Sequence, residues 1–152
     1  MNQIKKSFFM LVCMILASAA FTSCEWDQSP EYDHPIFASY TISAEYKSFS
    51  GNEKVLTDIM AWVKANAIYF SEEINYKTGA IEEFAKSDSE AVTRFQEFKS
   101  MFKNYLLGVR NDLDRGVYGD TPKISATFNV FAKRGQGDNR DLVQETVEFN
   151  YP

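Results

Sequence analysis

The sequence predicts an α+β fold of two layers, in which two main helices lie on one face of a small, mainly antiparallel sheet. Three observations predict it. Apolar and polar residues alternate in segments near the beginning and the end of the domain, which is typical of half-buried strands. Between these segments, apolar residues recur every three or four positions, which is typical of amphipathic helices. Helices that interrupt few strands favour a helical layer on one side of a sheet.

The first predicted strand covers residues 36–46. Its alternate residues are apolar and share one face, which we expect to be buried: Ile36, Ala38, Tyr40, Ile42, Ala44 and Tyr46. The opposite face carries polar side chains: Ser39, Thr41, Ser43 and Glu45. This period of two predicts a strand with one face against the core and one face in water.

A helix is expected next. Residues 50–53 (Ser-Gly-Asn-Glu) have the pattern of a capping box, in which the serine and the glutamate satisfy unpaired backbone amides. Apolar residues then follow at helical spacing, and the helix is expected to end at about Asn66: Val55, Leu56, Ile59, Met60 and Val63. Residues 68–77 fit either a short strand or a continuation of the helical stripe, and we prefer the strand.

The longest predicted helix covers residues 89–115. Residues 87–90 (Ser-Asp-Ser-Glu) have the pattern of a second capping box, and Gly116 follows where a helix commonly ends. Its apolar stripe is regular: Val92, Phe95, Phe98, Phe102, Leu106, Val109 and Leu113. About 27 residues give a length of roughly 40 Å, so a bend at Gly108 is an alternative. Residues 80–85 are expected to add a separate helical turn before it.

Two strands are expected to close the chain, over residues 123–133 and 142–151. Both alternate apolar with polar residues. The segment between them, residues 134–140, is rich in Gly, Asp and Asn, which predicts an antiparallel hairpin. Residues 36–152 are therefore expected to form a single domain.

The first 24 residues have the order of a secretory signal. Lys5 and Lys6 supply positive charge, an apolar run begins at Phe8, and the small residues Thr22 and Ser23 precede Cys24. The apolar run from Phe8 to Phe21 covers 14 residues, which is shorter than the ~20 residues of a spanning helix. This length argues against an uncleaved membrane helix.

The segment Phe21-Thr22-Ser23-Cys24 resembles a lipobox, and with the preceding residues it resembles the signal of bacterial lipoproteins. Phe21 stands where leucine is commonest, and such relaxed boxes are similar to those of Bacteroidota lipoproteins. Glu25 and Asp27, on either side of Trp26, resemble the acidic export tags of surface lipoproteins in that group.

The resemblance implies that residues 1–23 are a signal peptide and that Cys24 carries acyl chains such as palmitate. Residues 24–35, polar and with two prolines, are then a flexible tether to the outer membrane of the cell envelope. Whether the domain faces the periplasm or the cell surface is left open. A plain signal peptide that is cut near Ala20, leaving Cys24 free, is the alternative.

Composition excludes several classes of function. The formal net charge is −5, which disfavours binding to nucleic acid because phosphate recognition needs a basic patch. Cys13 and Cys24 are the two cysteines, one in the signal and one at the lipid site, so we expect no disulfide and no cysteine-based metal site or nucleophile.

No motif in the sequence predicts catalysis, a metal or a cofactor. His34 is the single histidine and lies in the tether, away from the predicted core. The aspartates at 112, 114 and 120 partly match a calcium loop, but Gly116 comes one position early and Arg115 places a cation among the ligands. The glutamate pairs at 72–73 and 82–83 are interpreted as solvated surface residues.

Aromatic residues are the remaining candidates for binding. Trp62, Tyr69, Tyr76 and Tyr118 could lie off the apolar stripe and present ring faces to a partner, with packing in the core as the alternative. We therefore expect a lipid-anchored envelope protein that acts as a non-enzymatic binding or structural module for a protein or a glycan. The alternative is a small hydrolase that uses carboxylates brought together by folding, such as Glu72 and Asp112.

Overall fold

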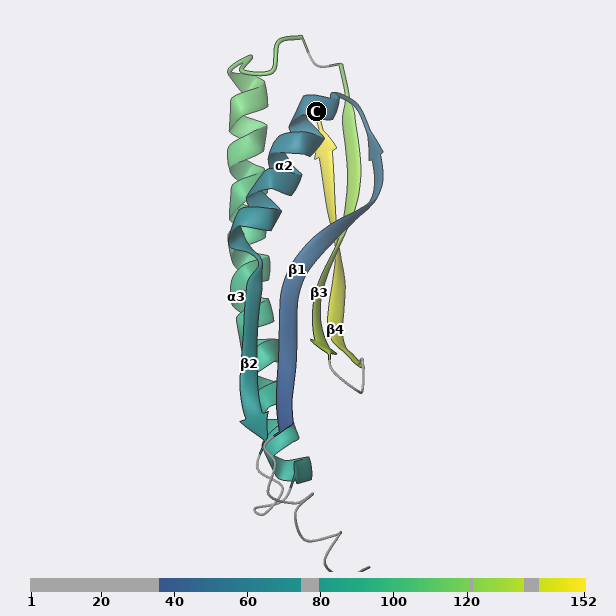
Figure 1. Cartoon of the computed structure of the whole chain (residues 1–152). Helices are drawn as coiled ribbons and strands as arrows, with labels where there is room; N and C mark the ends of the chain where they lie inside the picture. Colours follow the sequence, from purple (N-terminus) through teal and green to yellow (C-terminus); the bar gives the residue numbers. More distant parts are fainter. Residues whose placement is uncertain (1–35, 75–79, 121, 136–139) are drawn as a thin grey trace, which may run out of the picture.

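The computed structural model describes residues 36–74, 80–120, 122–135 and 140–152. The predictions for the signal, for Cys24, for the tether and for Tyr76 concern residues outside these ranges. The elements follow one another as β1 (Ile36–Ser50), α2 (Glu53–Asn66), β2 (Ile68–Ile74), α3 (Ala80–Asp114), β3 (Ile124–Gly135) and β4 (Arg140–Tyr151) (Figure 1).

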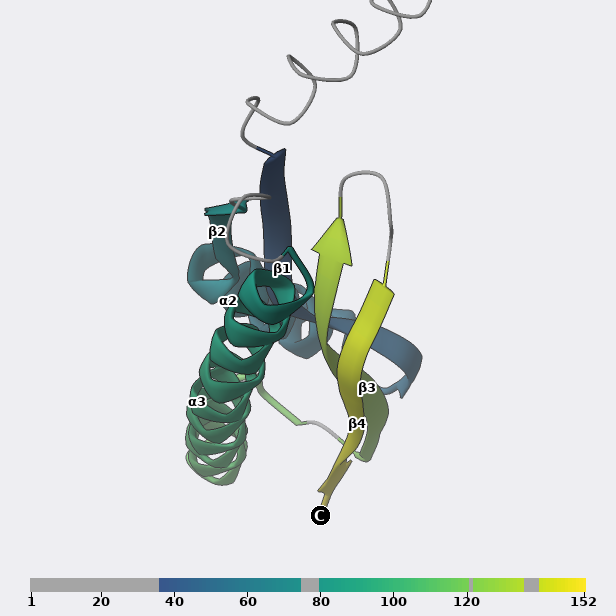
Figure 2. The same ribbon diagram turned by 90° about the horizontal axis from the view of Figure 1, so that it is seen from below.

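The four strands form one antiparallel sheet in the order β2-β1-β3-β4. The two helices pack against this sheet, and Figure 2 looks nearly along it and shows α3 on one side. The predicted α+β fold is confirmed, as are the strand over residues 68–74 and the antiparallel pairing of β3 with β4. Within the described residues, side chains from both helices and all four strands form two buried hydrophobic clusters.

Helix α3 is longer than the sequence predicted. It runs without interruption from Ala80 to Asp114, 35 residues or roughly 52 Å, and Gly108 lies within it. The predicted start at a capping box over residues 87–90 is wrong, as is the separate turn before it. Ser87 lies within α3 and its side chain is buried. Asp88 binds side chains of the sheet. Residues 87–90 match the capping pattern in sequence. The partners of Asp88, Tyr40 and Arg134, lie far away along the chain and leave no local signal.

The first predicted cap is also wrong by two residues. Asn52, not Ser50, caps α2, and its side-chain oxygen accepts a hydrogen bond of 2.9 Å from the backbone amide of Lys54. Ser50 is still paired with Ser125 in the sheet. Between strand and cap, Gly51 adopts φ +136°, and a Cβ atom there would lie 2.7 Å from the carbonyl oxygen of Lys123, so this tight turn favours glycine.

Strand β1 also extends beyond its predicted end. Its pairing with β2 ends at Ile42, and its pairing with β3 shifts register between Tyr46 and Ser48. This part of β1 is therefore at the edge of the sheet, next to a bulge. The prediction that Tyr46 is buried is wrong, because its side chain is 53% exposed there, whereas Ala38, Tyr40, Ile42 and Ala44 are buried as predicted.

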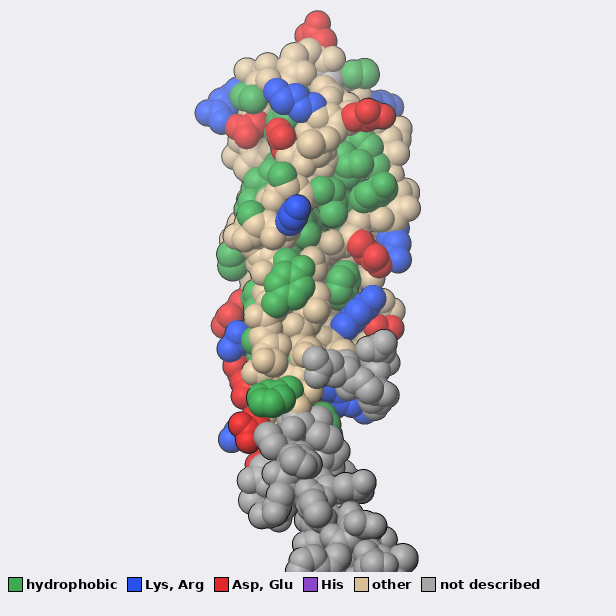
Figure 3. All heavy atoms as spheres, viewed as in Figure 1, with side chains coloured by type: hydrophobic (Ala, Val, Ile, Leu, Met, Phe, Trp, Pro, Cys, Tyr) green, Lys and Arg blue, Asp and Glu red, His purple; other side chains and the backbone are tan. Residues whose placement is uncertain are grey.

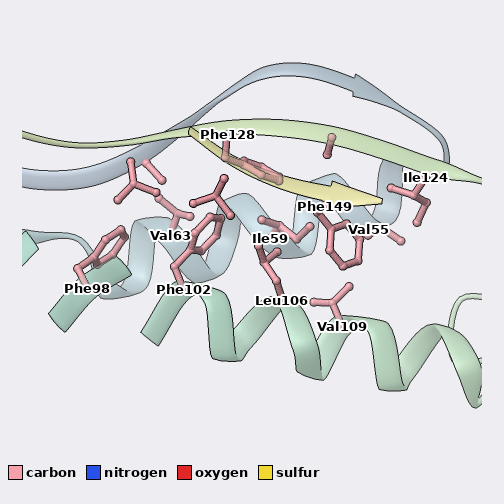
Figure 4. Packing of buried hydrophobic residues seen from close by; sticks show 14 of the residues in the cluster. Val55, Ile59, Val63, Phe98, Phe102, Leu106, Val109, Ile124, Phe128 and Phe149 are labelled. Carbon is pink, nitrogen blue, oxygen red and sulfur yellow. The ribbon is translucent and has the colours of Figure 1, made fainter. Parts of the chain in front are cut away.

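Three phenylalanines of α3 fill the centre of the core. The side chains of Phe95, Phe98 and Phe102 are fully buried, and the ring of Phe102 meets that of Phe128 on β3 edge to face, with centroids 5.3 Å apart. Figure 4 shows Phe98 and Phe102 pointing from α3 toward Val63 of α2 and the sheet. The predicted helical stripe is thus the main contact between the two layers.

A buried ion pair attaches the first part of α3 to the sheet. Arg134 of β3 donates to both carboxylate oxygens of Asp88, at 3.1 and 2.9 Å, and the Arg134 side chain is 8% exposed. The hydroxyl of Tyr40 donates to the same carboxylate at 2.8 Å. Burial, followed by the hydrogen bond to Asp88, raises the pKa of Tyr40 to about 12, so this hydroxyl remains a donor.

Replacing Asp88 with alanine is expected to lower the free energy of unfolding by about 3 kcal/mol, because it removes a buried carboxylate that accepts two hydrogen bonds from Arg134. Urea denaturation measures this loss. Glu90→Ala is the matched control, since it removes an exposed carboxylate that pairs with Arg94 on the same helix, and it is expected to cost about 0.5 kcal/mol or less. Equal losses in the two variants would contradict a special role for the buried pair.

Candidate functional site

The face of the sheet opposite to the helices carries the outward side chains of all four strands, and we call it the open face. It is defined by alternation with the buried residues of each strand. Its central residues are Ser39, Thr41, Ser43, Glu45, Tyr69, Ser71, Thr127, Asn129, Phe131, Lys133, Gln144 and Thr146. Hydroxyl and amide side chains dominate it, so the open face offers both hydrogen-bond donors and acceptors.

One row of the open face contains Tyr69 and crosses three strands. Tyr69 of β2 lies opposite Thr41 of β1, which lies opposite Lys133 of β3. Adjacent strands are about 4.8 Å apart, so the backbones at the two ends of this row are roughly 10 Å apart. The Tyr69 side chain is 70% exposed, whereas the ammonium group of Lys133 lies 4.5 Å from the ring centre of Phe131. Tyr69 therefore presents an exposed ring next to Thr41 on the open face.

A second row, nearer the middle of the sheet, is already hydrogen-bonded. The side-chain amide of Asn129 donates to Glu45 and to Gln144, both at 3.3 Å, and Lys47 pairs with Glu45 at 2.7 Å. The hydrogen bond from Lys47, and then that from Asn129, lowers the pKa of Glu45. These contacts fix the orientation of polar side chains across three strands before any partner arrives.

Trp62 and Tyr118 lie on the helical side of the molecule, away from the open face. The indole of Trp62 stacks on Tyr105 with centroids 4.8 Å apart and also contacts Phe98 and Phe102. The hydroxyl of Tyr118 donates to the Asp58 carboxylate at 2.9 Å. Burial, and then this hydrogen bond, raises the pKa of Tyr118. Both aromatic residues thus pack α2 against α3 and the turn that follows it.

Three of the four aromatic binding candidates lie among the described residues, and of these three only Tyr69 is mostly exposed. Tyr76 lies outside the described residues. The face of the sheet on which Tyr69 lies could have been predicted from the sequence. Its neighbours Ile68 and Phe70 pack against the core, and alternation places Tyr69 on the opposite face. The inward role of Trp62 depends on Tyr105, a residue far along the chain, and had no local signal.

The carboxylates of the hydrolase alternative do not meet. Glu72 lies on β2 near the beginning of β1, whereas Asp112 lies in the last turns of α3, at the other end of the molecule (Figure 1). Asp112 pairs with Arg115, and Asp114 accepts a hydrogen bond from the hydroxyl of Tyr151. Among the described residues, no group of three His, Cys, Asp or Glu side chains is placed to hold a metal ion.

Exposed apolar side chains are spread over several elements. The side chains that are about half exposed lie on β1, on α3 and in the turn after α3: Phe37, Tyr46, Met101, Leu107 and Val117. In the view of Figure 3, hydrophobic side chains form separate groups with charged side chains between them. This distribution gives no support to a purely structural subunit that would bury one large apolar surface.

Comparisons with known protein families, curated proteins and solved structures found no significant match to this chain. Neither helix in the described part of the chain combines the length and the apolar composition that crossing a bilayer requires.

The variant Tyr118→Phe is expected to lower the free energy of unfolding by about 1 kcal/mol at pH 7, because the Asp58 carboxylate loses a donor. The folded-state pKa of Tyr118 lies above the ordinary value of 10.0, so its contribution is complete below pH 10 and is lost as pH rises through the folded-state pKa. Denaturation at pH 7 and above pH 10 measures both. A difference between the two proteins that stayed constant with rising pH would contradict this assignment.

Proposed function

We propose that this protein is a non-enzymatic binding module, held at the bacterial outer membrane by lipid on Cys24. The resemblance of residues 21–24 to a lipobox supports the anchor. Two or more acyl chains hold a protein stably at a membrane, at about 0.8 kcal/mol for each buried methylene group. A tether of about 11 residues then gives the domain freedom to turn its open face toward a partner in the envelope.

The observation that carries the binding role is the exposed ring of Tyr69 on the open face. A flat surface of hydroxyl and amide groups can exchange hydrogen bonds with the hydroxyls of a sugar, and an exposed ring can pack against the apolar face of a sugar ring. The prearranged row of Glu45, Asn129 and Gln144 reduces the ordering that binding would require. These features favour a glycan partner, and a protein partner is the second candidate.

The separation of Glu72 from Asp112 speaks against the hydrolase alternative. General acid and base catalysis by two carboxylates needs them on opposite sides of one scissile bond, within about 10 Å of each other. Because α3 places Asp112 at the far end of the molecule, this pair does not meet that requirement.

The variant Tyr69→Ala is expected to weaken glycan binding about tenfold, because it removes the exposed ring without disturbing the core. Residues 25–152 would be titrated with soluble fragments of peptidoglycan and of outer-membrane polysaccharide by isothermal calorimetry. Met101→Ala, which shortens an exposed side chain on α3, is the control and should bind as the wild type does.

If no fragment binds, and purified outer-membrane proteins bind through Tyr69 instead, then the partner is a protein. Binding to either class that is insensitive to Tyr69→Ala would contradict the assignment of the open face.

The variant Cys24→Ala is expected to move the protein from the membrane fraction to the soluble fraction, because it removes the sulfur that would carry lipid. Cell fractionation followed by mass spectrometry of the N-terminus measures this. A wild-type protein whose N-terminus is unmodified, or begins before residue 24, would contradict the proposed anchor.

A further inference from the structure

A groove runs between α3 and β4, the strand at one edge of the sheet. Its volume is about 450 Å³, which is within the range of binding pockets in proteins. Its lining comes from Lys103, Leu106, Leu107 and Arg110 of α3 and from Thr146, Val147, Glu148 and Phe149 of β4. The groove lies at the β4 edge of the sheet and shares Thr146 with the open face.

The backbone of β4 faces this groove. Asn150 accepts a hydrogen bond at its carbonyl oxygen from the guanidinium of Arg110, so this carbonyl points away from β3. In an antiparallel pair, backbone groups alternate between the partner strand and the free edge. Thr146 and Glu148 therefore turn their amide and carbonyl groups to the same edge as Asn150. An extended peptide could pair with them as a fifth strand.

Two side-chain contacts join α3 to β4 on either side of the residues that line the groove. At one end, Lys99 of α3 pairs with Glu145 of β4 at 2.7 Å. At the other end, Arg110 binds the carbonyl of Asn150. The distance along β4 between these contacts is five residues, or about 17 Å. A strand beside Thr146 and Glu148 would therefore reach the guanidinium of Arg110 at one of its ends.

The rim of the groove is positively charged, although the protein as a whole is acidic. Lys103 and Arg110 form no ion pair with a carboxylate of the described residues. Glu148 also lines the groove, but alternation turns its side chain to the opposite face from Val147 and Phe149. The floor of the groove exposes little apolar surface, because the side chains of Leu106, Val147 and Phe149 are only 4 to 6% exposed. Leu107 at the rim is 59% exposed.

We propose that this groove binds the C-terminal end of another protein as a short fifth strand beside β4. The terminal carboxylate lies beside Arg110, with Lys103 adding to the positive potential, and an apolar side chain near the end packs on Leu107. Charge complementarity favours a chain end, which carries a carboxylate, over an internal segment, which does not. The free backbone edge and the small apolar area favour a peptide over an acyl chain.

Fluorescence polarisation with residues 25–152 tests the proposal. The probe is a pool of fluorescein-labelled heptapeptides with four randomised C-terminal positions and a free carboxylate, compared with the same pool as C-terminal amides. We expect the carboxylate pool to bind and to be enriched in apolar final residues, and the amide pool to bind at least tenfold more weakly. Arg110→Gln and Leu107→Asp should each weaken binding at least tenfold.

The controls are Lys86→Gln and Met101→Asp, which change the same kinds of residue elsewhere on α3, and Tyr69→Ala on the open face. All three should retain binding, and urea denaturation verifies that every variant is folded. Absence of binding by the carboxylate pool, or equal binding by both pools, would overturn the proposal. A dimer in sedimentation that Leu107→Asp dissociates would also overturn it, because a second copy of this chain would then occupy the groove.

Discussion

Helix α3 is the element on which the rest of this structure depends. Its 35 residues cover one face of the sheet along most of the length of the strands, so a single helix fixes which face is buried. Phe98 and Phe102 bind its middle to the sheet and to α2, and the pair of Asp88 with Arg134 binds its first half. A break between these positions would separate the apolar contact at the middle of the helix from the ionic contact in its first half.

This arrangement divides the surfaces by role. The helical side uses its aromatic residues for packing, as Trp62 and Tyr118 do, and the Tyr118 hydroxyl has its hydrogen-bond partner within the fold. The opposite face needs no cover, because its side chains are mostly hydroxyl and amide groups that water satisfies. Where α3 passes along the edge strand β4, the two elements leave a groove rather than a closed contact. The candidate binding surfaces are thus the parts of the sheet that α3 does not cover.

Local periodicity was sufficient to predict most of the fold. Alternation identified three strands and favoured a strand over a helix at residues 68–74, and the apolar stripe of α3 identified the contact between layers. Both patterns follow directly from which side chains are buried. The errors occurred where a distant residue decides a local outcome. Asp88 was predicted to belong to a helix start because residues 87–90 match a capping box. Its partner, Arg134, is 46 residues away, so no local pattern reveals the pair. The groove depends on the order of strands in the sheet, which no local pattern contains.

The continuity of α3 can be measured directly as a distance. Residues 25–152 contain no cysteine, so Lys86→Cys and Asn111→Cys introduce two sites for spin labels, both exposed on α3. An unbroken helix separates these positions by about 37 Å, and pulsed electron resonance should give one distribution centred near that distance. A shorter distance, or two populations, would show a break or bend within α3 and would contradict the account of how the sheet is covered.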